Sequence, residues 1–184
     1  ARSGISVVTT DQGVEARRQR HASAVTHHFG SREGLLLELL SRRGGPVDDE
    51  RGRLRSSLGP EPDLPELVRC LAEPYCEMLH TEPGRSYVRI VAQLRGRFAA
   101  WRGESDSATS KHLAAILDEI EQRPALSAAL RRERVVALIM VLTATTAERA
   151  RRIDEGVLPE LGHPAFVGNL VDMCSAVVLA PHTG

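Results

Sequence analysis

Apolar residues recur at helical spacing along most of this chain, and Pro, Gly or polar clusters separate the apolar stretches. Alternating apolar and polar positions of the length that a β-strand needs are missing. The pattern therefore predicts an all-α fold. In the later part of the chain, helices are expected over residues 64–80, 85–101, 107–123, 126–154 and 164–179.

A further helix is expected to begin at about Ser31, whose hydroxyl can accept hydrogen bonds from the free N–H groups of the next turn. Glu33 adds negative charge beside the positive end of the helix dipole. We expect this helix to continue over residues 35–43 and to break at the Gly-Gly-Pro run 44–46. A polar helix over residues 47–58 then links two domains.

Residues 9–28 have the pattern of two short helices joined by a tight turn. A cap-like cluster at 9–11 precedes a polar helical stretch to Gln19, a turn follows at 19–21, and the second helix covers 22–28. This arrangement is a helix-turn-helix candidate.

The second of these short helices has an apolar side and a polar side. Val25 and Phe29 share the side that is expected to pack against the domain. In a helix-turn-helix the other side enters the major groove, where hydroxyls contact donors or acceptors and methyl groups contact thymine. That side carries Ser23, Ala24, Thr26 and His27. Such a face is more often simply solvated, so it does not indicate DNA binding by itself.

Over residues 9–36 the chain resembles the N-terminal DNA-binding domain of the tetracycline-repressor-like (TetR) family of bacterial transcription regulators. The resemblance rests on Thr9-Thr10 before the family's second helix and on Val14 and Val25 at its buried positions. It rests most specifically on the string His-Phe-Gly-Ser-Arg-Glu-Gly-Leu-Leu at 28–36.

The resemblance implies a fold and a function. The fold is a helix-turn-helix DNA-binding domain over residues 1–45, followed by a helical effector-binding and dimerisation domain over residues 46–184. The function is that of a DNA-binding transcriptional regulator, a repressor that a small-molecule effector releases from operator DNA. Neither a cofactor nor a metal is implied, and the expected location is the bacterial cytoplasm.

Phosphate contacts provide register and much of the affinity for DNA. By resemblance, Thr10 and Gln12 at the start of the second helix contact phosphates. Arg32 occupies the position where the family commonly places a phosphate-binding Lys or Arg. The complete set of expected DNA-binding residues is Thr10, Gln12, Ser23, Ala24, Thr26, His27 and Arg32.

Some residues depart from the family pattern. Glu15 and Gln19 stand where the family usually has Ala and Gly, and His27 stands where Tyr is common. The family's first helix is largely missing, since residues 1–4 correspond only to its end, and the chain lacks an initiator Met. We expect a truncated N-terminus. The departures also leave open a second interpretation, a helical dimer of the same scaffold that has lost DNA binding.

The composition is that of a globular protein, with 42% hydrophobic and 26% charged residues. The formal net charge is zero, but it is unevenly distributed. Residues 1–43 carry seven arginines and four acidic residues, whereas residues 44–184 carry 17 basic and 20 acidic residues. A positive segment favours contact with a polyanion such as DNA, although a solvated surface is the plainer interpretation.

The three cysteines, Cys70, Cys76 and Cys174, are widely spaced, and no Cys-x-x-Cys or Cys/His ligand pattern occurs. We therefore expect buried free thiols in a reducing compartment and no metal site. The longest uncharged run, residues 135–147, has 13 residues and is too short to span a bilayer. No membrane association is expected.

The segments 126–154 and 164–179 are apolar on nearly all sides. Helices of this kind are not expected on the surface of a monomer. In the TetR family the last two long helices of each subunit form a four-helix bundle across a two-fold axis, so the resemblance implies a homodimer. The alternative is that both helices lie inside one core.

An effector cavity is expected between the DNA-binding part and these helices, because family members bind small, often apolar molecules there. The residues expected to line it are Tyr75, Met78, Phe98, Trp101, Met140 and Thr143. Polar groups that can orient the effector are Arg89, Gln93 and His112. Met and aromatic residues at helical spacing are also common in plain cores, so this alternative stays open.

An enzyme is the rival interpretation from another class. His27 and His28 are adjacent and diverge on a helix, and His80, His112 and His163 are isolated in the sequence. The chain has no His-Glu-x-x-His, Gly-x-Ser-x-Gly or phosphate-binding glycine-rich motif. We therefore expect no catalytic residues.

Overall fold

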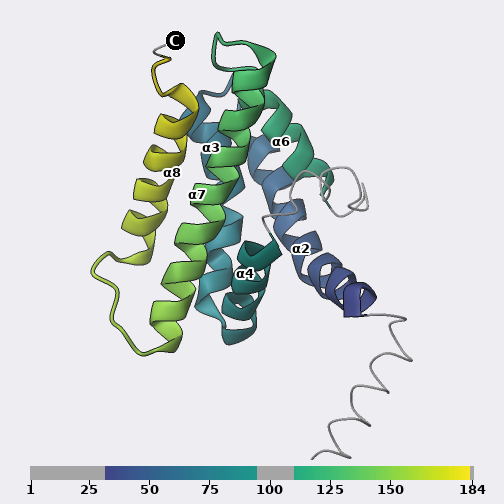
Figure 1. The fold of residues 1–184 in the computed structure, drawn as a ribbon, viewed down its shortest axis with the longest axis vertical. Helices are drawn as coiled ribbons and strands as arrows, with labels where there is room; N and C mark the ends of the chain where they lie inside the picture. The colour runs from purple at the N-terminus through teal and green to yellow at the C-terminus, as the bar shows by residue number, and fades with distance from the viewer. Residues whose placement is uncertain (1–31, 95–109, 183–184) are drawn as a thin grey trace, which may run out of the picture. The chain divides into compact units, whose positions relative to one another are not determined.

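The computed structural model describes residues 32–94 and 110–182, and in this part of the chain it contains helices and no strand (Figure 1). The predicted all-α class is confirmed for these residues. The helices are α2 (Arg32–Ser57), α3 (Leu64–Glu77), the 3-10 turn η1 (Met78–His80), α4 (Glu82–Leu94), α6 (Lys111–Glu121), α7 (Ala128–Asp154) and α8 (His163–Leu179). The chain divides into two units, residues 1–39 and 40–184, and every described side chain lies in the second.

Helix α2 continues through the Gly-Gly-Pro run at 44–46, so the predicted break is wrong. Pro46 removes one backbone hydrogen bond from the helix, but the residues that follow it are held by tertiary contacts. A Cβ on Gly44 would lie 3.0 Å from the Tyr87 hydroxyl, and one on Gly52 would lie 2.6 Å from the His112 ring. Both glycines therefore permit close approach of α2 to its neighbours.

The core of the second unit forms around α3, which packs against α8 and α6. A capping box starts α3: Asp63 Oδ1 accepts from the Glu66 backbone N–H, and Glu66 accepts from that of Asp63, both at 2.8 Å. The largest fully buried side chains are Leu67, Leu71, Ile116, Leu117, Ile120, Leu138, Leu170, Val68, Val88, Val135, Val171 and Val178. They come from α3, α4, α6, α7 and α8.

Helices α7 and α8 run antiparallel and side by side, and the loop 155–162 joins them (Figure 1). Ser127 caps α7 by accepting a hydrogen bond from the Leu130 N–H. Helix α4 packs along α7, and η1 connects α3 to α4. Within residues 32–94 and 110–182, no helix is both long enough and apolar enough to cross a membrane.

Candidate functional site

Most of the expected DNA-binding residues lie outside the described residues. These are Thr10, Gln12, Ser23, Ala24, Thr26 and His27. Arg32 is the first residue of α2. Its place at a helix start agrees with the position expected for a phosphate contact, and its role stays a prediction.

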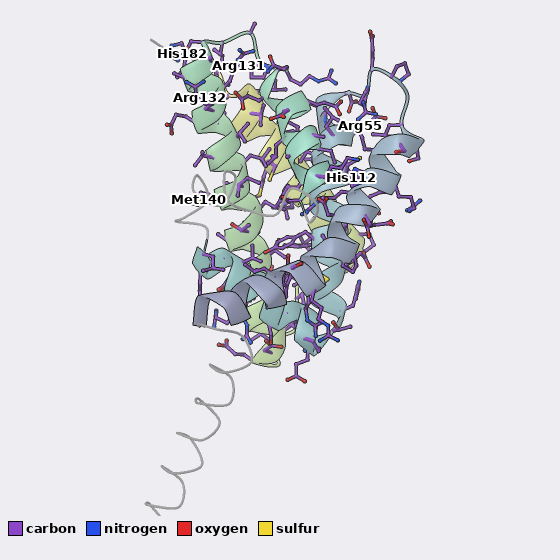
Figure 2. All side chains as sticks on the ribbon, turned by 90° about the vertical axis from the view of Figure 1, so that its right-hand side faces the viewer. Arg55, His112, Arg131, Arg132, Met140 and His182 are labelled. Carbon is purple, nitrogen blue, oxygen red and sulfur yellow. The ribbon has the colours of Figure 1, made fainter. Side chains whose placement is uncertain are left out.

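The expected effector residues separate into a buried group and an exposed group. Tyr75 and Thr143 are buried, Met78 is partly buried, and Met140 keeps 38% of its surface exposed. In the view of Figure 2, Met140 lies on the opposite side of the helices from Arg55 and His112. Thr143 donates its hydroxyl hydrogen bond to the Ile139 carbonyl of its own helix at 2.7 Å. The remaining two residues, Phe98 and Trp101, lie outside the described part of the chain.

The polar groups expected to orient an effector are also dispersed. Arg89 pairs with Asp154 at 3.1 Å and Gln93 is exposed. A hollow of 410 Å³ lies beside this ion pair, lined by Glu82, Arg85, Arg89, Ile153 and Asp154. Its lining is mostly charged, and it does not match the apolar cavity that the sequence predicts.

A buried polar cluster surrounds Arg51 and includes Asp48, Tyr75 and Tyr87. Arg51 is 8% exposed, its Nε donates to the Leu71 carbonyl at 3.3 Å, and its Nη1 lies 3.8 Å from Asp48 Oδ1. The rings of Tyr75 and Tyr87 meet edge to face with centroids 6.4 Å apart, and the Tyr75 hydroxyl donates to the Val88 carbonyl. We call these four residues the Arg51 cluster.

Asp48 links the Arg51 cluster to α6. Its two carboxylate oxygens accept the backbone N–H groups of His112 and Leu113 at 2.9 and 2.8 Å. These N–H groups belong to the first turn of α6, where they have no partner within the helix. Asp48 therefore caps α6 from α2, while the neighbouring N-cap Ser110 makes no side-chain cap hydrogen bond.

Electrostatics within the Arg51 cluster follow from its burial. Burial lowers the pKa of Arg51, and the nearby Tyr87, Asp48 and Tyr75 act in the opposite direction. Burial also raises the pKa of Tyr75 well above its ordinary value and raises that of Tyr87. Both tyrosines stay neutral at physiological pH, and the guanidinium stays charged. The hydrogen bonds of Arg51 and Tyr75 go to backbone carbonyls within the protein, so the cluster holds α2 against α3 and α3 against α4.

The sequence pattern indicates Tyr75 but not Asp48 and Arg51, because the polar stretch 47–58 suggests a solvated linker. The signal available was local: Val47, Asp48 and Arg51 lie on one side of the helix at i, i+1 and i+4. The sequence pattern also does not indicate a second contact between α2 and α6. Arg55 makes a bidentate pair with Glu119, with Nε–Oε1 at 2.9 Å and Nη2–Oε2 at 2.8 Å.

Exposed apolar side chains lie along α7 and α8. Among the described residues, the exposed large hydrophobic side chains are Val136, Met140, Val157, Leu158, Leu161, Met173 and Leu179. All of them belong to α7, to α8 or to the loop between them. We call Val136, Met140 and Met173, which lie on the two helices, the C-terminal apolar face.

Part of the predicted interface lies inside the protomer instead. Leu138 has no exposed surface and Val171 is 1% exposed. These residues pack within the second unit, so a charge placed there disrupts the protomer and does not test for a dimer.

The three cysteines are free and buried, as predicted. Burial raises the pKa of the Cys76 thiol to about 11 and that of Cys174 to about 12. Burial also raises the pKa of Cys70. Thiols in this state react slowly, because the thiolate is the nucleophile.

Comparison with known proteins assigns no family to the chain: no protein-family model matches it, and no curated protein is significantly similar to it.

Proposed function

We propose that the protein is a DNA-binding transcriptional regulator, a homodimeric repressor of the TetR type that a small-molecule effector releases from operator DNA. The observation that carries the proposal is the sequence of residues 9–36. The sequence pattern there predicts two short helices and a tight turn, followed by the string at 28–36, in the order and spacing of the family's DNA-binding domain. The excess of arginine in residues 1–43 is consistent with contact to a polyanion.

The continuity of α2 supports a route by which an effector acts on DNA binding. The same helix carries Arg32 in its first turn and Asp48 and Arg51 in its buried half. Asp48 and Arg51 fix this half of α2 to α6 and α3. An effector that displaces α3 or α6 therefore acts on the helix that begins at Arg32.

The C-terminal apolar face supports the homodimer. We propose that a second copy of the chain covers it, with α7 and α8 of both protomers forming a four-helix bundle. Val136 and Met140 are one helical turn apart on α7, and Met173 is exposed on α8. A two-fold contact of this kind uses the same face on both protomers. In the TetR family such a bundle sets the two recognition helices about one DNA turn apart, so the resemblance implies the same spacing here.

The effector is proposed to bind next to Tyr75, within the helices between residues 64 and 147. The expected class of effector is a small, largely apolar molecule, as the resemblance implies. An effector that releases DNA 100-fold must favour the released form by about 2.7 kcal/mol. A screen of metabolites by thermal shift, followed by DNA release, tests this step. Ligands that stabilise the protein without changing its DNA affinity would contradict it.

A second candidate function is a dimer of the same scaffold that does not bind DNA. Glu15 and Gln19 favour it, because they replace the small residues that the family usually has in its second helix and turn. A mobility-shift assay of the protein with DNA from upstream of its own gene separates the two functions. The regulator binds this DNA more tightly than a random duplex, and substitutions at Thr26 or His27 change the sequence preference. Equal binding to both duplexes, or none, favours the second candidate.

A further inference from the structure

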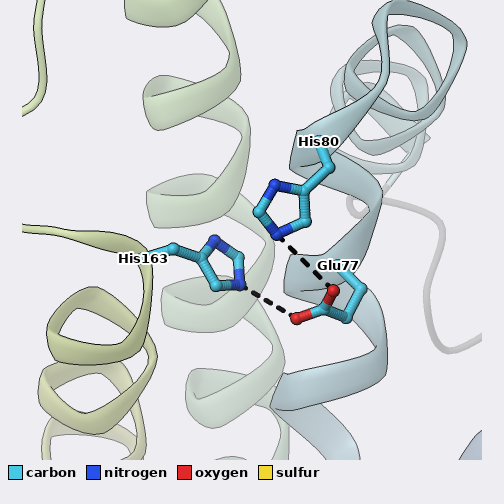
Figure 3. A group of neighbouring side chains, drawn as sticks. All are labelled: Glu77, His80 and His163. Atoms are coloured by element: carbon cyan, nitrogen blue, oxygen red, sulfur yellow. Dashed lines mark hydrogen bonds and ion pairs between the residues drawn. The ribbon is translucent and has the colours of Figure 1, made fainter.

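Three side chains with metal-binding chemistry meet where α3 ends and α8 begins (Figure 3). Glu77 is the last residue of α3, His80 closes η1 and His163 is the first residue of α8. His80 and His163 are far apart in the sequence, so only the folded structure shows that they meet. The carboxylate and imidazole ligand atoms of the three residues all lie within 4.8 Å of one another.

Both imidazoles direct Nε2 at the same carboxylate. His163 Nε2 lies 3.1 Å from Glu77 Oε1, and His80 Nε2 lies 3.5 Å from Glu77 Oε2. The two imidazole rings are 4.3 Å apart between centroids. Zinc binds such atoms at about 2.0–2.2 Å, which separates neighbouring ligands of a tetrahedron by roughly 3.3–3.6 Å. The observed separations from Glu77 are close to this value, so a cation fits after small side-chain rotations.

The backbone around the three side chains is held by other contacts. Glu77 and His80 are three residues apart at the end of one helical segment, which brings their side chains to the same side. His163 is positioned by Arg149, whose Nη2 donates to the Leu161 carbonyl at 2.8 Å and whose guanidinium lies 4.2 Å over the Phe166 ring. These contacts fix the chain immediately before and after His163.

The group is open to solvent. The side chains of Glu77, His80 and His163 are 56%, 55% and 21% exposed. A bound cation therefore has an entry path and retains room for a water ligand. Two imidazoles and one carboxylate are the ligand set of several zinc sites with an open position, whereas Mg²⁺ and Ca²⁺ prefer oxygen ligands. The thiols do not compete, because Cys70, Cys76 and Cys174 are buried.

We propose that Glu77, His80 and His163 form a binding site for a divalent transition metal of the zinc class. The bound metal bridges the end of α3 to the start of α8 and takes its remaining ligand from water. The site does not depend on the proposed DNA binding, and it can exist in either of the two candidate functions.

The direct test is calorimetric titration of the full, untagged chain with Zn²⁺, with Mg²⁺ as the comparison cation. The expected result is one Zn²⁺ per chain with micromolar or tighter affinity and no comparable binding of Mg²⁺. Co²⁺ bound at the same site should give the visible absorption of a low-coordination Co²⁺ complex, and Zn²⁺ should displace it.

Variants connect the binding to these residues. His163→Gln and His80→Gln should each weaken Zn²⁺ binding by at least about tenfold, because even residues behind the ligands change metal affinity by roughly 10–100-fold. His182→Gln is the matched control. His182 lies beyond the C-terminal end of α8 (Figure 2). His163 starts that helix, which is roughly 24 Å long. Circular dichroism of the metal-free variants checks their fold, and the more exposed His80 keeps the test usable if His163→Gln does not fold.

Two results would overturn the site. One is a wild-type chain that shows no saturable Zn²⁺ binding, in which case Glu77 only forms ion pairs with the two histidines. The other is a Glu77→Gln, His80→Gln, His163→Gln triple variant that binds Zn²⁺ as tightly as the wild type, which would place the metal on other residues.

Discussion

The α7–α8 hairpin has two apolar sides, and they differ in what covers them. Leu138 and Val171 on the inner side are buried within the protomer, whereas Met140 and Met173 on the outer side are exposed. An apolar helix in a sequence therefore does not distinguish a core from an interface. The inner side determines the stability of the protomer, and we expect the outer side to determine its assembly.

Charged residues on α2 show the same contrast. Asp48 and Arg51 are an i, i+3 pair that is buried, and Glu50 and Arg53 are an i, i+3 pair on the same helix that is exposed. The two pairs have the same spacing and the same orientation along the helix. Burial, and the hydrogen bonds that Asp48 makes to α6, are what distinguish them.

The largest effect is expected from breaking the buried pair. Asp48→Ala leaves Arg51 buried without its carboxylate and removes the cap of α6, so unfolding free energy should fall by about 3–5 kcal/mol. Glu50→Ala is the matched change at the exposed pair and should alter stability little. Urea denaturation of both variants measures the difference. Similar losses of unfolding free energy for the two variants would show that burial does not determine how much each ion pair contributes to stability.

The next largest effect is expected from a buried apolar residue of α7, compared with an exposed apolar residue of the same helix. Leu138→Ala opens a cavity in the core and should lower the unfolding free energy by about 2–5 kcal/mol. Met140→Ala, two residues later on the exposed side, should cost much less in the protomer. The comparison is made at protein concentrations low enough to dissociate a dimer. The prediction is wrong if Met140→Ala lowers the unfolding free energy of the protomer as much as Leu138→Ala does.

Dimer formation is expected to depend on the exposed residues of α7 and α8 and not on the buried ones. Met140→Glu and Met173→Glu place an unpaired charge in the proposed dimer contact, so dimer affinity should fall by at least tenfold while the protomer stays folded. Ala115→Glu adds the same charge to the exposed side of α6 and serves as the control. Sedimentation equilibrium reports the oligomeric state. A wild-type chain that is monomeric at micromolar concentration contradicts the dimer.

A pH dependence is expected from the buried thiols of α3 and α8, and it is the smallest effect near neutral pH. The thiols of Cys76 and Cys174 have pKa values of about 11 and about 12 in the folded protein, against 9.0 as the ordinary value. The contribution of these neutral thiols to the unfolding free energy is therefore fully present below about pH 9. It is lost as the pH rises towards the pKa values of the folded protein. Each thiol adds a slope of about 1.4 kcal/mol per pH unit in that range. Cys174→Ala should show a shallower alkaline decline than wild type, and an unchanged slope would contradict burial as the cause.

Local signals predict the helices well, and long-range contacts explain the failures. Pro, Gly and capping residues place the starts and ends of α3, α7 and α8 within two or three residues of the structure. The predicted break at 44–46 is wrong because tertiary contacts of Val47 and Arg51 outweigh the local cost of Pro46.

The missed site residues have a similar explanation. Asp48 meets its partners on α6 across 64 and 65 residues of sequence, and His163 meets Glu77 across 86. No local pattern brings together side chains that far apart, because the packing of the helices decides which of them become neighbours. Tyr75 is indicated by the sequence because it is aromatic within an apolar helix, whereas the charged residues of its cluster, Asp48 and Arg51, are not.

DNA affinity at several salt concentrations tests the central claim most directly. Fluorescence anisotropy with the upstream duplex compares wild type, Arg32→Ala and the control Arg42→Ala, which removes an exposed arginine from a later turn of the same helix. Wild type is expected to bind this duplex specifically, and Arg32→Ala is expected to weaken binding to specific and random DNA alike. Its salt slope should be shallower by about one unit, because one phosphate contact is lost. Equal slopes for Arg32→Ala and Arg42→Ala, or a wild-type chain with no affinity for the duplex, would contradict the account.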